Sequence, residues 1–205
     1  MKSLRLPCFT ALLLPFFTSA GHATAEPSIA DLYADSFRIG VALSAHQIQG
    51  TDPAQARIRD GHFNSYTAEN EMKWERIHPT EGNYDFTSAD TLAKLGESNG
   101  AFLVGHTLVW HNQVPDWVFT DSEGIPADRE RVLERMRSHI KKMVTRYRGR
   151  FEGWDVVNEA LNEDGTMRES NWYEAVGADY IAEAFAAAHA ADPDAKLYYN
   201  DYNLY

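Results

Sequence analysis

The sequence predicts an α/β fold in which parallel strands alternate with helices, and three observations lead to that prediction. Short apolar or β-branched runs recur along the chain, and amphipathic helical patterns lie between them. Polar residues capable of chemistry follow the ends of successive runs. Cys8 is the only cysteine, so packing rather than a disulfide must hold the core. Such alternation implies right-handed crossovers and a parallel sheet.

The first 25 residues are expected to be a secretory signal peptide. Lys2 and Arg5 precede an apolar stretch at residues 8–17, and an A-x-A cleavage site follows at residues 23–25. The stretch is shorter than the roughly 20 residues that a membrane-spanning helix needs. We therefore expect a secreted product, either extracellular or periplasmic.

The net charge argues against nucleic acid and anionic membranes as partners. Loss of the leader removes two of the 19 basic side chains and none of the 30 acidic ones, so the formal charge changes from -11 to -13. Such a surface repels phosphate groups. The remaining residues, 26–205, suffice for one domain, and no linker or repeat divides them.

Five strands are expected, at residues 37–43, 63–67, 101–109, 151–157 and 196–199. Three of the helices between them can be placed, at residues 88–98, 128–148 and 170–191. In each of the two longer helices, apolar residues recur at steps of three and four along one face. Gly100 and Gly149 end the first two helices, and Asp192-Pro193 ends the third.

The positions of the polar residues favour a closed barrel over an open doubly wound sheet. They gather after four successive strands, as Glu69, Asn70, Glu71 and Lys73, then His106, Trp110 and His111, then Asn158 and Glu159, then Asn200 and Asp201. Barrel sites are assembled in this way, whereas an open sheet uses one switch point. We predict a TIM (β/α)8 barrel that is incomplete, with about the first five strands and four helices, because a whole barrel takes about 250 residues.

Four motifs in order along the chain carry a family resemblance. They are Phe63-Asn64-Ser65-Tyr66-Thr67-Ala68-Glu69-Asn70-Glu71-Met72-Lys73-Trp74, Gly105-His106-Thr107-Leu108-Val109-Trp110-His111, Trp154-Asp155-Val156-Val157-Asn158-Glu159-Ala160 and Tyr199-Asn200-Asp201-Tyr202-Asn203. Together they resemble glycoside hydrolase family 10, the β-1,4-xylanases. The resemblance spans residues 37–205 and implies a secreted enzyme that cleaves internal bonds of xylan with retention of configuration and needs no cofactor.

The resemblance also implies roles for single residues. Glu159 would be the general acid/base, and Asn158 would hydrogen-bond the sugar 2-hydroxyl at the reaction centre, where such bonds strengthen in the transition state. Further sugar contacts would come from Glu69, Asn70, Lys73, His106, Trp110 and Asn200. Without the resemblance, His106 and Trp110 could equally be core residues, Asn158 a turn former, and the cluster at residues 69–73 a solvated helix start.

The family's nucleophile has no counterpart among these motifs. In the family it is a glutamate at the tip of strand seven, and retaining hydrolysis places it about 5 to 5.5 Å from the acid/base. Glu69, Glu71 and Asp201 are candidates by charge alone. We therefore expect that the 205-residue chain by itself has no significant hydrolytic activity.

Two other functions stay open, namely a non-catalytic half-barrel that binds xylan or pairs with another chain, and a β-1,4-glucanase of the same clan. Metal catalysis is not expected. His106 and His111 are five residues apart on a strand, so their side chains should face opposite ways, and no matching acidic ligands accompany them.

Overall fold

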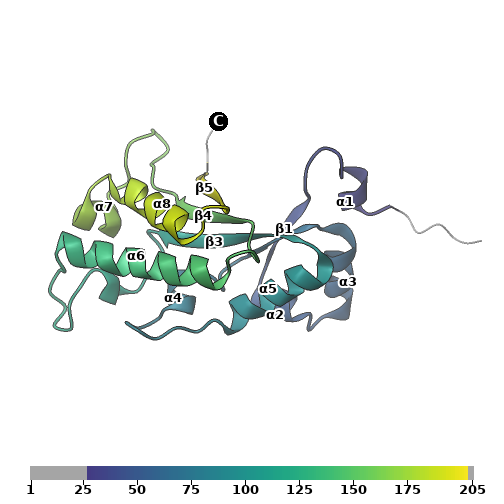
Figure 1. The fold of residues 1–205 in the computed structure, drawn as a ribbon, viewed down its shortest axis with the longest axis horizontal. Coiled ribbons are helices and arrows are strands. Elements are labelled where there is room, and N and C mark those ends of the chain that lie inside the picture. Colours follow the sequence, from purple (N-terminus) through teal and green to yellow (C-terminus); the bar gives the residue numbers. More distant parts are fainter. Residues whose placement is uncertain (1–26, 203–205) are drawn as a thin grey trace, which may run out of the picture.

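The centre of the molecule is a parallel sheet whose five strands follow the order of the chain (Figure 1). The computed structural model describes residues 27–202, so the predicted leader lies outside the described residues. The strands are β1 Gly40–Leu43, β2 Ser65–Ala68, β3 Phe102–Trp110, β4 Gly153–Asn158 and β5 Lys196–Asn200. Each strand pairs in parallel with the next, so the carboxyl ends of all five lie at one edge. The predicted order of strands is confirmed.

The first two strands begin later than the sequence suggested. Regular pairing starts at Gly40 and Ser65, which are partners in the register. Just before them, the Ile39 amide donates to the side-chain oxygen of Asn64 at 2.8 Å, where a regular strand pair would have a main-chain carbonyl as the acceptor. A side chain that occupies a main-chain group in this way ends regular pairing.

Helices fill each of the four connections between these strands. Within the described residues the α-helices are α1 Ile29–Leu32, α2 Ala45–Gln49, α3 Pro53–His62, α4 Trp74–Ile77, α5 Thr87–Asn99, α6 Arg129–Arg146, α7 Asn171–Val176 and α8 Tyr180–Ala191, with a short 3-10 turn at Asp116–Val118. The helix expected before β2 is α3, which the sequence had not located. It begins with Asp52, whose carboxylate accepts from the Ala54 amide at 2.8 Å.

The long helix α6 forms where the apolar periodicity predicted it. Asp128 caps its first turn by accepting from the Arg131 amide at 2.8 Å. Its apolar face is fully buried and includes Val132, Met136 and Ile140. Regular helix ends at Arg146, slightly before the predicted end.

The single helix predicted at residues 170–191 is wrong, because the structure divides it into α7 and α8. Gly177 separates them with φ +93°, a backbone conformation that side chains other than glycine rarely adopt. Apolar spacing continues from Val176 to Tyr180 across the break, since both side chains are buried. The periodicity therefore concealed the turn.

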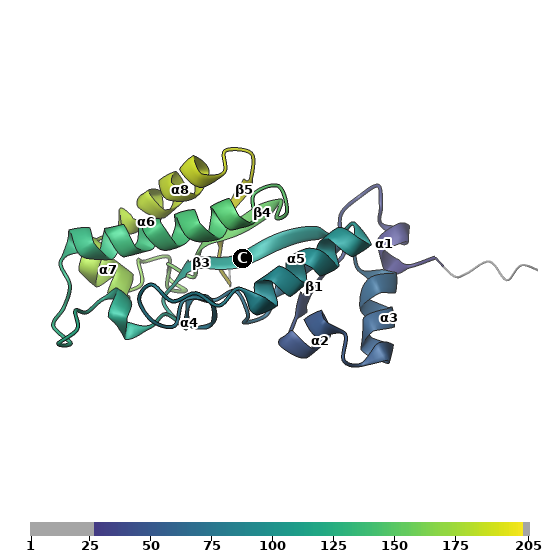
Figure 2. The ribbon, with the colours of Figure 1, turned by 60° about the horizontal axis from the view of Figure 1, so that its bottom comes forward.

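The helices cover one face of the sheet. Helix α5 packs against β2 and β3, α6 against β3, and α8 against β4 and β5, and the three run along the same side of the sheet (Figure 2). Gly105 allows a close approach on this face, since a Cβ there would lie 2.2 Å from the Trp154 ring. In the described residues the opposite face is only partly covered, and Tyr198 on it is 36% exposed.

No helix within residues 27–202 is both long enough and apolar enough to cross a membrane.

Candidate active site

Glu159 comes directly after β4, at the carboxyl edge of the sheet. Its φ is +53°, in the left-handed region that few residues other than glycine adopt. Two bonds hold its main chain in that conformation. The Glu159 amide donates to the Asn200 carbonyl at 2.8 Å, and its carbonyl accepts from Nε of Arg168 at 3.0 Å. Glu159 is therefore tied both to β5 and to the loop that follows β4.

The carboxylate of Glu159 is held by an indole. Nε1 of Trp110, at the end of β3, donates to Oε2 of Glu159 at 2.8 Å. The two strand ends lie side by side because Trp110 and Asn158 are partners in the register. One carboxylate oxygen is thus fixed, which leaves the other for an incoming ligand.

Asn158 and Asn200 bridge the ends of β4 and β5. Nδ2 of Asn200 donates to Oδ1 of Asn158 at 2.7 Å. If the Asn158 amide is turned by half a rotation, its nitrogen donates to the Asn200 carbonyl at 3.3 Å and its oxygen accepts from Trp110 at 3.1 Å. In either orientation the buried amide of Asn158 lies between its neighbours Trp110 and Asn200.

His106 lies on the partly covered face of β3 and pairs with Asp155. Nδ1 of His106 is 2.9 Å from Oδ2 of Asp155 on β4, and both side chains keep some exposure, 18% and 15%. A carboxylate at Nδ1 fixes the tautomer, so Nε2 is left as the free ring nitrogen. Asp155 stands in one of the four motifs but was not predicted to act at the site, although an acidic residue inside an apolar strand is a signal for such a role.

Asn70 and Lys73, which follow β2, form a second cluster beside Trp110 together with Gln113, which follows β3. Nζ of Lys73 donates to Oδ1 of Asn70 at 3.0 Å and lies 4.5 Å from the centroid of the Trp110 ring. Gln113, which the sequence had not indicated, also donates to Oδ1 of Asn70, at 3.3 Å.

Lys73 is the main electrostatic feature of this cluster. It is 8% exposed, and burial lowers its pKa, whereas the carboxylates of Glu69, Glu159 and Glu71 oppose that shift. The influence of Glu159 means that the positive charge of Lys73 acts at the same centre as the β4 tip. Glu69, Lys73, Trp110 and Glu159 therefore belong to one site.

Glu71 has a structural role that explains why it lies in the cluster. Its carboxylate accepts from the amides of Ala45 at 2.7 Å and Asn70 at 3.0 Å, so both oxygens are used in joining α2 to the loop after β2. Asp201 also is occupied, because it bonds the Tyr199 hydroxyl and accepts from the Leu161 amide at 3.3 Å.

His111 follows Trp110 and lies close to the same centre. Burial lowers its pKa, the positive charge of Arg168 adds to that effect, and the carboxylate of Glu159 opposes it. Within residues 27–202, no group of three or more His, Cys, Asp or Glu side chains is arranged to hold a metal ion.

Trp172, a residue of α7 that was not among the predicted site residues, contacts Trp110. Its Nε1 donates to the Trp110 carbonyl at 2.9 Å, and it is 1% exposed. Its ring stacks on Trp74, with ring centroids 5.2 Å apart, and Trp74 directly follows Lys73. The buried pair of Trp172 and Trp74 therefore connects Trp110 to the chain next to Lys73.

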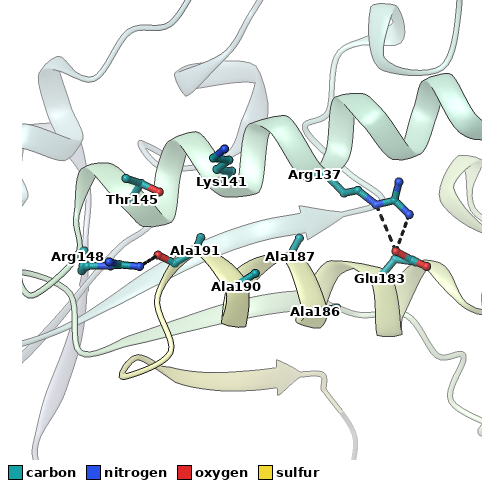
Figure 3. Close-up of a pocket in the computed structure, with 9 residues that line it drawn as sticks. All are labelled: Arg137, Lys141, Thr145, Arg148, Glu183, Ala186, Ala187, Ala190 and Ala191. Carbon is teal, nitrogen blue, oxygen red and sulfur yellow. Dashed lines mark hydrogen bonds and ion pairs between the residues drawn. The ribbon is translucent and has the colours of Figure 1, made fainter.

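A groove of about 480 Å³ lies elsewhere, on the outer surface between α6 and α8 (Figure 3). An ion pair between Arg137 and Glu183 (2.7 Å) lies at one end, and the remaining lining comes from Lys141, Thr145 and Arg148 and from alanines of α8. None of the predicted site residues lines this groove. The chemistry predicted from the sequence is therefore confined to the carboxyl edge of the sheet.

Comparison with known proteins identifies the family of the chain. The family model described as Glycosyl hydrolase family 10 matches residues 28–205. The chain belongs to glycosyl hydrolase family 10. The family's fold is the TIM barrel, and the five parallel strands with their helical crossovers are consistent with an incomplete one, so the predicted fold class is confirmed.

Most of the curated relatives that match this family 10 chain are named as xylanases. The endo-1,4-beta-xylanase A of Xylanibacter ruminicola is 46% identical over 204 residues, which are 100% of this chain and 54% of the relative. The endo-1,4-beta-xylanase B of Paenibacillus barcinonensis is 45% identical over 183 residues, 88% of this chain and 54% of the relative. An exoglucanase of Acetivibrio thermocellus is 42% identical over 186 residues, 87% of this chain and 17% of the relative.

Solved structures of family 10 enzymes superpose closely on this chain. An endoxylanase from a sugarcane soil metagenome has a TM-score of 0.82 at 43% identity, covering 86% of this chain and 51% of that one. An intracellular xylanase variant from Thermoanaerobacterium saccharolyticum, in complex with xylotriose, has a TM-score of 0.83 at 40% identity, covering 88% of this chain and 58% of that one. This family 10 chain thus spans about half the length of these two structures and of the two xylanases named above.

Proposed function

We propose that these residues form the acid/base half of an endo-1,4-β-xylanase that hydrolyses xylan with retention of configuration. The main support for the proposal is the position of the Glu159 carboxylate at the tip of β4, where Nε1 of Trp110 donates to it at 2.8 Å. Around it stand Lys73, Asn158 and His106, in a chain of a family whose named relatives are mostly xylanases.

In the proposed mechanism Glu159 protonates the glycosidic oxygen as the bond to the leaving sugar breaks. It then removes a proton from the water that attacks the glycosyl-enzyme intermediate. Both steps need the same carboxyl to keep one position, and the bond from Trp110 together with the fixed main chain provides this. Asn158, beside it, is placed to bond a sugar hydroxyl near the reaction centre.

The other polar residues are proposed to bind the sugar. Lys73, Asn70 and Glu69 offer a cation, an amide and a carboxylate to hydroxyl groups, and the indole face of Trp110 offers a surface for a sugar ring. His106 presents its free Nε2, because Asp155 occupies Nδ1. Asn200 acts through its contact with Asn158.

Retention needs a second carboxylate about 5 to 5.5 Å from the first. Glu71 and Asp201 are already bonded to neighbouring groups, and Glu69 lies beside Lys73. We propose that the nucleophile is not among the 205 residues of this chain, so the chain alone shows no significant hydrolysis of xylan.

The test compares this chain with an extended chain, defined as residues 26–205 joined after Tyr205 to the C-terminal part of the Paenibacillus barcinonensis relative. The extended chain should release reducing sugars from xylan, and proton NMR should show the β-anomer forming first. A folded extended chain without activity on xylan, or one giving the α-anomer first, would refute the proposal.

A β-1,4-glucanase is the second candidate, and the exoglucanase among the relatives favours it. Hydrolysis of carboxymethylcellulose by the extended chain, measured beside xylan, separates the two. A non-catalytic half-barrel is the third candidate, suggested by the partly covered face of the sheet. Isothermal titration of the 205-residue chain with xylo-oligosaccharides, without turnover, would support it.

Secretion is proposed from residues 1–25 alone. Expression of the entire sequence in a bacterial host should yield a product that begins at residue 26 outside the cytoplasm. A product that retains its first residues and stays inside the cell would contradict it.

A further inference from the structure

Glu159 holds a backbone conformation that its own side chain does not favour. Its φ of +53° lies in the left-handed region, and residues other than glycine persist there only where the surroundings enforce it. The side-chain bond from Trp110 acts beyond Cβ and does not constrain φ directly. The enforcing contacts must therefore be those on its amide and its carbonyl.

Arg168 supplies the contact on the carbonyl. Its guanidinium spans two main-chain carbonyls of the segment after β4, with Nε donating to Glu159 at 3.0 Å and an NH2 nitrogen donating to Leu161 at 2.9 Å. The same nitrogen donates to the Tyr202 hydroxyl at 3.1 Å, beyond β5. A planar fork with several fixed donors suits this arrangement, which a lysine ammonium cannot reproduce.

A tight hairpin brings Arg168 back to the strand tip. Asn162 donates through its amide to the Thr166 carbonyl at 2.8 Å, and Gly165 takes the left-handed conformation of the turn with φ +81°. Leu161 and Met167 then pair antiparallel. The Arg168 amide donates to the Ala160 carbonyl at 2.8 Å, so its side chain starts next to Glu159.

Arg168 also places a positive charge at the site, since its charge contributes to the lowered pKa of the neighbouring His111. The positive charge and the hydrogen bond of the Arg168 guanidinium therefore both act at the Glu159 carbonyl. Asn200 holds the preceding peptide unit, through the bond from the Glu159 amide at 2.8 Å, so Glu159 is held on both sides of its Cα.

We propose that Arg168 is a positioning residue for the acid/base, because its guanidinium bridges the Glu159 and Leu161 carbonyls and locks Glu159 in its left-handed conformation. The proposal rests on the proposed function in assigning Glu159 its catalytic role. The contacts of Arg168 with the Glu159 and Leu161 carbonyls are a property of the folded chain, so their effect on Glu159 can be measured without substrate.

The test is NMR of the 205-residue chain with three variants, Arg168→Met, Arg168→Lys and Arg129→Met. Arg129 is the matched control, because its Nε donates to the Val176 carbonyl at 3.1 Å, far along the chain from β4. Arg168→Met should raise the exchange rate of the Glu159 amide about tenfold relative to the Trp154 and Val156 amides in the same strand.

A second readout follows the Trp110 indole proton, which reports on the carboxylate of Glu159. Arg168→Met should move its chemical shift toward that of an indole without a hydrogen bond, because hydrogen bonds weaken steeply when they bend. Arg168→Lys, which keeps the charge and loses the fork, should give an intermediate result and serves if Arg168→Met does not fold.

Unchanged exchange at Glu159 in Arg168→Met, or an equal rise throughout β4 that Arg129→Met also produces, would overturn the proposal. Full retention of the wild-type values in Arg168→Lys would show that charge alone matters and would overturn the bridging role. No substrate is used, so failure of the xylanase proposal would appear in hydrolysis assays and not here.

Discussion

Glu159 and its neighbours are fixed by contacts that each involve a different strand end. Trp110 at the end of β3 holds the carboxylate, Asn200 of β5 holds the amide, and Lys73 after β2 brings a buried cation to the same centre. Each residue is ordinary in isolation. They can act together because the fold brings all of them to the carboxyl edge of the sheet.

Lys73→Met is expected to weaken xylo-oligosaccharide binding about tenfold, since a hydrogen bond from a charged donor is worth about 1.5 kcal/mol or more. Isothermal titration of the extended chain in its Glu159→Gln form, in which turnover is slow, measures this. Lys94→Met, an exposed lysine of α5, is the control and should bind as the wild type does. Equal affinity in both variants would remove Lys73 from the site.

The residues at the strand tips could be named from the sequence, but their supports could not. Glu159, Asn158 and Trp110 stand in contiguous motifs. Arg168 lies in a polar loop, and its role depends on a hairpin that returns the chain to the strand tip. Because this return depends on tertiary structure, the local sequence pattern did not predict the contact between Arg168 and Glu159.

Helix α7 contributes to the site through Trp172, although it carries no chemistry of its own. The helix begins at the cap formed by Ser170, which accepts from the Tyr173 amide at 3.3 Å. This start places Trp172 in the first turn, where its indole reaches the Trp110 carbonyl. The break at Gly177 then lets α8 pack along α6 as a separate element.

Trp172→Phe should lower the free energy of unfolding by about 1 to 2 kcal/mol more than Trp154→Phe, because only the first leaves a buried carbonyl without its donor. Both indoles are 1% exposed, and within the described residues Nε1 of Trp154 has no hydrogen-bond partner. Urea unfolding of the two variants gives the comparison. A larger loss for Trp154→Phe would contradict the supporting role of Trp172.

Element order was predictable from periodicity, whereas the division of the last helical region was not. The buried pair Val176 and Tyr180 keeps helical spacing across Gly177, so the pattern looks continuous. Only the positive φ of Gly177 reveals the break. A glycine inside an apolar pattern is compatible with both outcomes.

The stability of the molecule as a whole should depend on pH through a buried histidine. His78 is 5% exposed, accepts from the Gly82 amide at 3.1 Å, and stacks on Tyr84. Burial lowers the pKa of His78 from its ordinary 6.5 to about 4. The unfolded chain therefore binds the proton first, so stability is complete above pH 6.5 and is lost as pH falls toward 4.

Between pH 7 and pH 5 this histidine should cost about 2 kcal/mol of unfolding free energy. His78→Gln should remove this contribution and leave that of the fully buried His139, whose pKa burial also lowers, and His189→Gln, at an exposed position of α8, is the control. Urea unfolding at the two pH values measures it. The same pH dependence in His78→Gln would show that other groups govern acid stability.

The sheet as described presents two edges and one partly covered face. Strands β1 and β5 each pair on one side only within residues 27–202, and Phe37 is 57% exposed. Unpaired edges recruit other strands. We predict that the 205-residue chain self-associates in light scattering and that Tyr198→Lys, which puts a charge on the open face, reduces this. A monomer with a sharp unfolding transition would contradict the prediction.

The central claim is that Glu159 is the acid/base of a xylan-cleaving site. Its most direct test is the rate of reducing-sugar release from xylan by the extended chain, its Glu159→Gln variant and its Glu123→Gln control, which changes an exposed glutamate in a turn. We expect Glu159→Gln to lower the rate by about 10² to 10⁴, the usual contribution of general acid–base catalysis, and Glu123→Gln to leave it unchanged. Wild-type rates in a folded Glu159→Gln variant would contradict the account.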